Sequence, residues 1–156
     1  MRIVVVAVGK RQPEWVNEGF ADYARRVRGS CTLELIEIPL GRRSKSSSND
    51  KARTEEARRM LRSLPPVAHV VTLSEAGRTW STHQLAERLR HWATLGAPVG
   101  LLIGGPDGLA EECEARADES WSLSPLTFPH GLVRVILAEA LYRAWSATEG
   151  HPYHRP

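Results

Sequence analysis

The chain has 156 residues, of which 42% are hydrophobic and 25% are charged, so its composition predicts one folded domain over residues 1–156 and excludes a disordered segment. Its longest apolar run, Ile3–Val8, is far shorter than the roughly 18 residues of a membrane span, and the residues after Met1 show no signal-peptide pattern, which predicts a cytoplasmic protein without membrane contact. The net charge is +3, and residues 1–62 hold 14 of the 21 Lys and Arg but only 8 of the 18 Asp and Glu, which favours a nucleic-acid partner.

The first half of the chain alternates between strand and helix patterns. Ile3–Val8 is a continuous apolar run rich in β-branched residues, typical of a strand covered on both faces. After Pro13, apolar residues recur every three or four positions, which predicts a helix that closes near Gly29. The elements predicted up to residue 64 are a strand over 3–8, a helix over 13–29, a strand over 32–38, a flexible basic loop over 41–50 and a helix over 50–64.

The second half continues the alternation. Ser81 or Thr82 is a suitable N-cap for a helix, and Gly96 is a suitable residue to end it. The elements predicted here are a strand over 67–73, a turn over 74–78, a helix from 82 to 96, a strand over 98–103, a glycine turn over 104–108, a short acidic helix over 110–120, a strand over 121–128 and a helix over 131–148. Strands that alternate with helices predict an α/β fold with a mostly parallel sheet and helices on both faces.

The last predicted helix is apolar nearly all round. Val133, Ile136 and Leu137 lie on one side of it, and Leu132 and Val135 lie on another. A helix of this kind must be covered on nearly every side. Because it comes last in a chain of this size, we expect a second copy of the chain to supply part of that cover, which predicts a homodimer.

The glycine turn Gly104–Gly108 follows a predicted buried strand. In open α/β sheets ligands bind at the carboxyl ends of strands, where glycine lets the backbone approach a ligand closely. The turn has neither a Gly-Lys-Ser/Thr ending nor a GxGxxG pattern, which favours a nucleoside-like ligand without a polyphosphate. An equally good interpretation is a tight strand-to-helix turn that needs glycine for a positive φ.

Residues 121–130 and the chain end carry the other candidate groups. Two prolines and several hydroxyls over 121–130 predict an irregular loop at the sheet edge, which is a ligand loop or a rigid connector, and His130 has the position of a capping or surface residue. Arg143 stands four residues after Glu139, which favours a surface salt bridge, although its apolar neighbours indicate a guanidinium that needs an anionic partner. The ending Gly150–Pro156 is either a frayed terminus or a segment in which Tyr153 anchors two functional side chains.

Cys31 and Cys113 fit neither a CxxC motif nor a zinc-ligand spacing. We therefore expect two buried, unreactive thiols and no metal site.

Several of these segments together resemble a known family. The runs LLIGGPDGL (101–109), WSLSPLTFPHGLVRVILAEALYRAWS (121–146) and HPYHR (151–155), with VVVAVGKRQPEWVNEGFADYARR (4–26) and LELIEIP (33–39), are similar to the RlmH family of bacterial large-subunit rRNA methyltransferases, which are of the SPOUT class. The resemblance covers nearly the whole chain. One departure is the serine-rich basic loop at 44–48.

The resemblance implies a fold, a reaction and a set of partners. The fold would be a SPOUT domain with a trefoil-knotted C-terminal half. The reaction would move the methyl group of S-adenosylmethionine to N3 of a pseudouridine in 23S rRNA, on the assembled ribosome and by a homodimer. The cofactor contacts implied by position are Leu73, Gly104, Gly105, Leu123, Ser124, Pro125, Leu126, Thr127 and Phe128.

The chemistry of such a reaction suggests roles for the remaining candidates. The pseudouridine N3 must lose its proton before it attacks, so a base such as His154, or a cation such as Arg143 or Arg155 beside the developing negative charge, would help. We expect these three residues to act across the dimer interface. Phosphates would be neutralised by basic residues of the first half, whose alternative role is a solvated helix face: Arg42, Arg43, Lys45, Arg58, Arg59 and Arg62.

Two other classes of function remain open from the residues alone. One is a ribosome-binding factor without catalytic activity, in which the basic half holds RNA and the glycine turn is only structural. The other is a flavodoxin-like module that binds a flavin nucleotide, which the missing phosphate loop disfavours.

Overall fold

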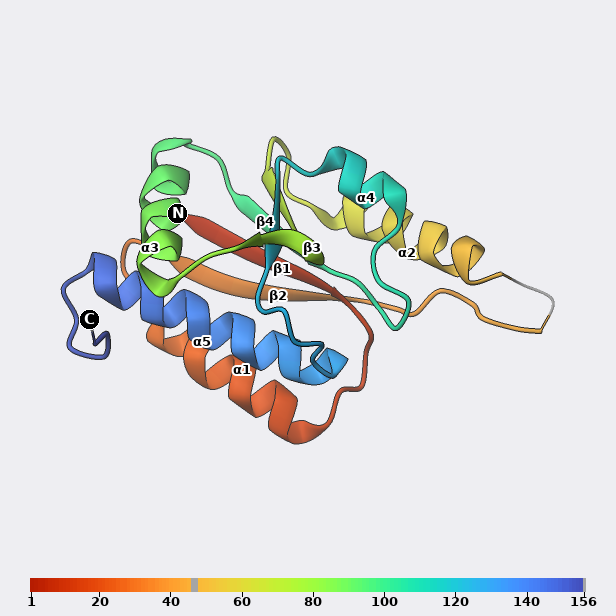
Figure 1. Ribbon diagram of the computed structural model, residues 1–156, viewed down its shortest axis with the longest axis horizontal. Coiled ribbons are helices and arrows are strands. Elements are labelled where there is room, and N and C mark those ends of the chain that lie inside the picture. The colour runs from red at the N-terminus through yellow and green to blue at the C-terminus, as the bar shows by residue number, and fades with distance from the viewer. Residues whose placement is uncertain (46–47, 156) are drawn as a thin grey trace.

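A computed structural model describes residues 1–45 and 48–155 (Figure 1). Within these residues five strands form one sheet in the order β2-β1-β4-β3-β5, and every neighbouring pair is parallel. The strands are β1 (Arg2–Val8), β2 (Thr32–Ile38), β3 (His69–Thr79), β4 (Val99–Ile103) and β5 (Glu119–Ser122). The parallel α/β architecture predicted from the sequence is confirmed, and the trefoil knot stays a prediction.

Helices cover both faces of the sheet, as predicted. They are α1 (Glu14–Arg26), α2 (Asn49–Ser63), α3 (Thr82–Thr94), α4 (Glu111–Arg116) and α5 (His130–Thr148). Figure 1 shows α1, α3 and α5 on one side of the sheet and α2 and α4 on the other. The capping box of Ser81 and Gln84 begins α3, which confirms Ser81 as the N-cap.

The interior strand β1 contributes side chains to both layers of the core. Ile3, Val5 and Ala7 pack beneath α1, α3 and α5, whereas Val4 and Val6 pack beneath α2 and α4. None of these side chains is more than 2% exposed. Because each fully buried Val or Ile contributes about 1.5–3 kcal/mol, this short strand supplies a large part of the stability of the sheet.

Three predicted elements near the β3–β5 edge of the sheet are wrong in their bounds or type. The small residues of 74–78 predicted a turn, but β3 continues through them and pairs Arg78 with Trp121 after a register shift. A Cβ on Gly77 would lie 2.6 Å from the Trp121 backbone nitrogen, so glycine serves close strand contact there and not a turn. The strand predicted over 121–128 instead ends at Ser122, and the predicted helix over 110–120 is limited to α4.

Helix α5 is covered partly from within the chain. It lies against the sheet, with α1 on one side and α3 on the other. Its side chains that stay only half-buried include Leu132, Val133, Val135 and Ile136. The chain itself therefore covers much of the helix, and the homodimer stays a prediction.

The two cysteine thiols are buried and free, as predicted. Burial raises the pKa of both Cys31 and Cys113 to about 11, so neither is a reactive thiolate near neutral pH. Among the described residues, no helix is both long enough and apolar enough to cross a bilayer. The same residues contain no cluster of three His, Cys, Asp or Glu side chains that could hold a metal ion.

Candidate functional site

Two adjoining cavities open beside the middle of β3 and at the carboxyl end of β4. The larger has a volume of about 390 Å³ and lies between the glycine turn Gly104–Gly108 and the start of α5. The smaller, of about 100 Å³, lies beneath the loop that follows β5. Both are lined by Leu73, Ser74, Glu75, Phe128 and Val133. The larger cavity alone falls in the range of about 300–1,000 Å³ that is usual for small-molecule sites.

The predicted cofactor residues gather around these cavities. Gly104, Gly105 and Thr127 line the larger one. The smaller one is lined by Leu123, Ser124 and Leu126, and both are lined by Leu73 and Phe128. Pro125 belongs to the same loop but is exposed and lines neither cavity. Residues from three separate stretches of the sequence thus meet at one edge of the sheet.

The glycine turn is a tight turn, which confirms the structural interpretation of its sequence. The Gly108 amide donates to the Gly105 carbonyl oxygen at 3.0 Å, and Gly108 has a φ of +79°. Gly104 has a different reason to be glycine, because a Cβ there would lie 2.5 Å from the Gly108 carbonyl carbon. The same turn lines the larger cavity, and its contact with a ligand stays a prediction.

The loop after β5 is irregular but held by hydroxyl groups. Ser122 donates to the Ser124 carbonyl oxygen at 3.0 Å, and the Ser124 hydroxyl accepts from the Leu126 amide at 2.9 Å. Thr127 donates to Glu75 at 3.0 Å, which ties the loop to β3. The predicted irregular loop is confirmed, and these bonds give the cavity a fixed rim.

The lining residues favour a ligand that is partly apolar and not polyanionic. Leucine, phenylalanine and valine side chains form the walls, and Glu75 and Glu114 are the carboxylates among them. No Lys or Arg of the described part of the chain lines either cavity. Because a polyphosphate requires cations or a nest of amides, this set suits a nucleoside with a neutral or positive substituent.

Below the site, His130 and Arg134 hold the carboxyl end of β1. His130 Nε2 lies 2.5 Å from the Val8 carbonyl oxygen, a contact in which the ring donates and which therefore requires a proton on Nε2. The Arg134 side chain is 1% exposed and donates to the Gly9 carbonyl oxygen at 2.7 Å and to Glu37 at 2.6 Å. The interpretation of His130 as a surface or capping residue is therefore wrong, because its ring is turned inward.

The burial of His130 predicts a pH dependence of stability. Burial lowers the pKa of His130 below its ordinary 6.5, and the positive Arg134 lowers it further, against the opposing hydrogen bond to Val8. The unfolded chain therefore takes up this proton at a higher pH than the folded chain. The contribution of neutral His130 to the free energy of unfolding should be fully present above about pH 6.5 and should be lost as the pH drops below this value.

Thermal unfolding from about pH 8 to about pH 5.5 measures this effect. His130→Gln keeps a donor for Val8 but cannot take up a proton, so its melting temperature should fall less over this range. Exposed His91 on α3 provides the matched control, and His91→Gln should keep the wild-type profile. Parallel profiles for wild type and His130→Gln would contradict the assignment.

The predicted catalytic residues lie away from the cavities. Arg143 donates to Glu139 from Nε at 2.8 Å and from Nη2 at 2.6 Å, so the predicted salt bridge is confirmed. The hydrogen bond to Glu139 raises the pKa of Arg143. Arg143 stands 13 residues after His130 on α5, which puts it roughly 20 Å from the cavity end of the helix at 1.5 Å per residue.

The described part of the chain end, residues 150–155, is anchored on α5 through Tyr153. The Tyr153 ring lies 4.5 Å from the Tyr142 ring and its hydroxyl donates to Glu139 at 3.1 Å. Burial, together with Glu139, raises the pKa of Tyr153 to about 12. His154 is half-buried and its Nδ1 has no partner among the described residues, whereas Arg155 is exposed. Tyr153 is therefore the predicted anchor, and the Arg143 guanidinium lies over its ring, 5.0 Å from the ring centre.

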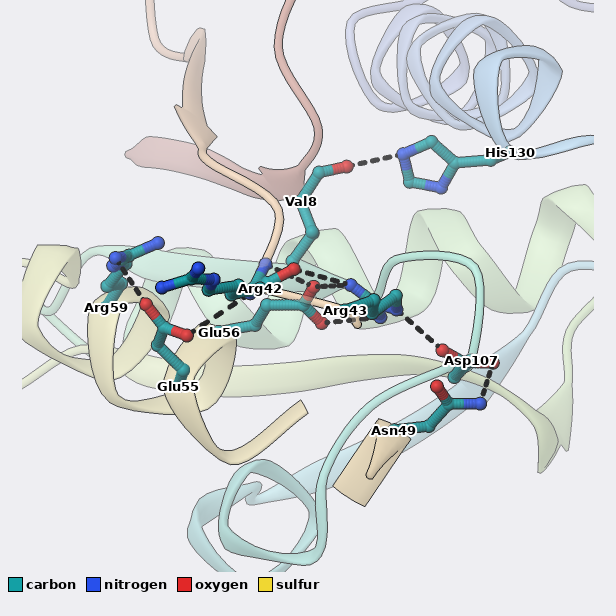
Figure 2. A network of polar contacts seen from close by, with 10 residues as sticks. Val8, Arg42, Arg43, Asn49, Glu55, Glu56, Arg59, Asp107 and His130 are labelled. Carbon is teal, nitrogen blue, oxygen red and sulfur yellow. Dashed lines mark hydrogen bonds and ion pairs between the residues drawn. The ribbon is translucent and has the colours of Figure 1, made fainter. Parts of the chain in front are cut away.

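Sequence reasoning missed a buried ionic network behind the glycine turn (Figure 2). Arg43 was expected to contact phosphate, but its guanidinium donates to Glu56 at 2.7 Å and to Asp107 at 2.8 Å. Glu56 is only 2% exposed, and it raises the pKa of Arg43. No sequence signal links these residues, because Arg43 and Asp107 are 64 positions apart.

The other basic residues predicted to bind phosphate fall into two groups, one paired with a carboxylate and one exposed to solvent. Arg59 is paired with Glu55 at 2.6 Å on the same helix. Arg42, Lys45, Arg58 and Arg62 are exposed. These four side chains are the part of the predicted phosphate-binding set that faces solvent.

Comparisons with known proteins agree with this arrangement. A family model described as "Predicted SPOUT methyltransferase" matches residues 1–154. A protein of Alkalilimnicola ehrlichii named "Ribosomal RNA large subunit methyltransferase H" is 55% identical over 99% of both chains, and one of the same name from Hahella chejuensis is 50% identical over 99% of both.

Solved structures share the fold at low sequence identity. A probable methylase family protein from Haemophilus influenzae Rd KW20 has a TM-score of 0.53 at 13% identity, covering 99% of this chain and 70% of its own. A crystal structure of TrmJ from Z. mobilis ZM4 has a TM-score of 0.50 at 16% identity, covering 91% of this chain and 68% of its own. These likenesses concern the fold, whereas the family match over residues 1–154 and the relatives at 50–55% identity show that the chain belongs to the SPOUT methyltransferase family, in its ribosomal RNA large subunit methyltransferase H branch.

Proposed function

We propose that this protein transfers a methyl group from S-adenosylmethionine to N3 of a pseudouridine in 23S rRNA, on the assembled ribosome in the cytoplasm and as a homodimer. The observation that carries the proposal is the meeting of two motif segments, 101–109 and 121–146, with residues 73–75 of β3 at one pair of cavities. The names of relatives that are 50% or more identical over nearly the whole chain support the reaction class and the rRNA substrate.

The cavities suit the proposed methyl donor. S-adenosylmethionine combines a flat adenine, ribose hydroxyls and a positively charged sulfonium, and when bound it supplies an activated methyl group. Apolar walls from Leu123, Leu126 and Phe128 fit the adenine. Glu75 and Glu114 are the carboxylates available to hydroxyls or to positive charge. The lack of a phosphate-binding loop fits a donor that carries no phosphate.

The protein's own contribution is alignment and control of a proton. Rigid walls that hold a reacting pair in place remove much of the entropic barrier to the reaction. In the proposed site His154 accepts the N3 proton of the target base. The exposed guanidinium of Arg155 stabilises the negative charge that develops on that base, and Arg143 is a second cation for the same charge. These three residues are gathered by the anchored chain end, where Tyr153 contacts Glu139 and lies beneath the Arg143 guanidinium.

The distance between the cavities and the proposed catalytic residues at the chain end supports a homodimer. Within one chain, α5 separates the anchored end from the cavities by roughly 20 Å. A partner whose α5 runs in the opposite direction would bring its chain end to these cavities. The half-buried apolar residues Leu132, Val135 and Ile136 on α5 support such a contact. The exposed Arg42, Lys45, Arg58 and Arg62 would then neutralise rRNA phosphates.

Mass spectrometry of 23S rRNA tests the proposal. Cells that lack the gene should lose one methylated pseudouridine, and the wild-type gene should restore it. We expect Arg155→Ala to reduce methylation by about 10²–10³-fold, because it removes one charge partner of the transition state. Calorimetry should show that Arg155→Ala binds S-adenosylhomocysteine as tightly as wild type.

The same experiments separate the competing functions. A non-catalytic ribosome-binding factor would bind neither the donor nor its product, and its loss would leave the modification pattern unchanged. Full methylation by Arg155→Ala would remove the chain end from the mechanism while leaving the cavity assignment intact.

A further inference from the structure

The network behind the glycine turn joins three segments that are distant in sequence. It consists of Arg43 in the loop after β2, Glu56 on α2 and Asp107 in the turn (Figure 2). Asn49, at the start of α2, also donates to Asp107 at 3.4 Å. Glu56 additionally accepts from the Gly41 amide at 2.8 Å. The only direct ionic link between the turn and the rest of the described chain is thus Arg43 with Asp107.

The geometry puts this network on the opposite side of the turn from the cavity. Gly104, Gly105, Pro106 and Gly108 line the larger cavity, but Asp107 does not, and its carboxylate points to Arg43 (Figure 2). A Cβ on Gly105 would lie 3.5 Å from Glu56 Oε1 and 2.9 Å from Val8 Cγ1. The turn backbone therefore rests directly on the buried carboxylate, with the cavity on its other side.

The turn does not need this ion pair for its own conformation. Pro106 presets φ at the second position of the turn, and Gly108 supplies the positive φ that follows. The Gly105–Gly108 hydrogen bond closes it. Among the described residues, the Asp107 side chain makes no hydrogen bond within the turn, and its polar contacts are with Arg43 and Asn49. The ion pair therefore fixes where this preformed turn lies relative to β4 and α2.

We infer that Arg43 is a positioning residue. Its ion pairs with Glu56 and Asp107 fix the glycine turn in the place where the turn forms a wall of the proposed donor site. This inference rests on the proposed donor site. It makes Arg43 part of the cofactor machinery through the turn, without contact with the donor. It also distinguishes Arg43 from its exposed neighbours Arg42 and Lys45, whose side chains remain candidates for rRNA contact.

The sharpest variant is Asp107→Ala. It removes the ion pair between the turn and Arg43 but leaves the Arg43–Glu56 pair intact. Arg43→Met is less suitable, because it would leave Glu56 buried without its partner and disturb folding. We expect Asp107→Ala to raise the Kd for S-adenosylhomocysteine in calorimetry by about tenfold. The KM for the donor should rise in parallel, with a smaller change in kcat. Asp107→Asn keeps an acceptor for Arg43 and should recover most of the affinity.

Arg53→Met is the matched control. Arg53 is also an arginine ion-paired with an aspartate, Asp50, on α2, but it does not reach the turn. It should bind S-adenosylhomocysteine with the wild-type Kd. A lower melting temperature of Asp107→Ala with an unchanged Kd would show a purely structural role and overturn the inference.

Amide hydrogen exchange over residues 104–109 is measured without any ligand, so it separates this inference from the proposed function. Exchange in this segment should be faster in Asp107→Ala than in wild type, with α2 unchanged. If wild type binds no S-adenosylhomocysteine, the proposed function fails, and faster exchange still supports the positioning of the turn by Arg43. Unchanged exchange together with an unchanged Kd contradicts it.

Discussion

Gly104→Ala is expected to weaken the binding of S-adenosylhomocysteine by about tenfold to a hundredfold. The added Cβ would lie 2.5 Å from the Gly108 carbonyl carbon and 2.7 Å from the Leu109 amide nitrogen. Both are backbone atoms on the far side of the same turn, so no side chain can move aside. The turn must open, at a cost of about 1–3 kcal/mol for such overpacking, and the cavity wall opens with it.

Calorimetry on the folded variant measures the loss, and Gly96→Ala is the control. Gly96 has a φ of +65° with open space around it, so alanine there costs backbone strain but meets no atom. It lies between α3 and the amino end of β4, at the opposite edge of the sheet from the cavities. Gly96→Ala should lower the melting temperature and keep the affinity. Equal affinity in Gly104→Ala and wild type would show that the turn is not part of the binding wall.

Arg134→Met is expected to lower the free energy of unfolding by about 3–5 kcal/mol, the usual cost of breaking a buried ion pair by removing one partner. The guanidinium is 1% exposed and contacts Glu37 and the carbonyl oxygens of Val8 and Gly9. Methionine fills a similar volume but donates no hydrogen bond. Two backbone carbonyls and one carboxylate would then lose their buried donor, and the carboxyl end of β1 would be free to move.

Urea unfolding with a matched surface pair checks this expectation. Arg2 on the same strand pairs with Glu34 at 2.5 Å, but both side chains are about half exposed, at 51% and 45%. Arg2→Met should therefore leave the urea midpoint nearly unchanged. Similar midpoints for Arg134→Met and Arg2→Met would mean that the buried network contributes no more than a surface pair.

The contrast between Arg134 and Arg143 shows which ion-pair partners the periodicity of a helix can predict. The sequence pattern selected Arg143 as the arginine among apolar residues that needs an anion, and it does pair with Glu139, four residues before it. The fully buried arginine is instead Arg134, whose partner Glu37 lies on β2. A pattern along one helix identifies partners at a spacing of four, but it carries no information about a strand 97 residues away.

Local patterns were sufficient for most strands and helices and for the glycine turn. Valine-rich runs, helical spacing and the Gly-Pro-Asp-Gly segment each act within a few residues, so they can be read without a fold. They failed at 74–78, where small residues predicted a turn, and at 121–128, where a strand was predicted that ends at Ser122. There the close approach of Gly77 to Trp121, a contact between strands, decides the conformation.

The amino-acid sequence by itself determined the alternation of elements, the parallel sheet and, through its motifs, the family and the residues around the cavities. Tertiary structure alone decided that His130 and Arg134 turn inward, that Arg43 serves Glu56 and Asp107, and that the chain end is held far from the cavities of its own chain. The physical reason is that ionic and hydrogen-bonded contacts between distant segments depend on chain crossings and burial, which leave no periodic trace along the sequence.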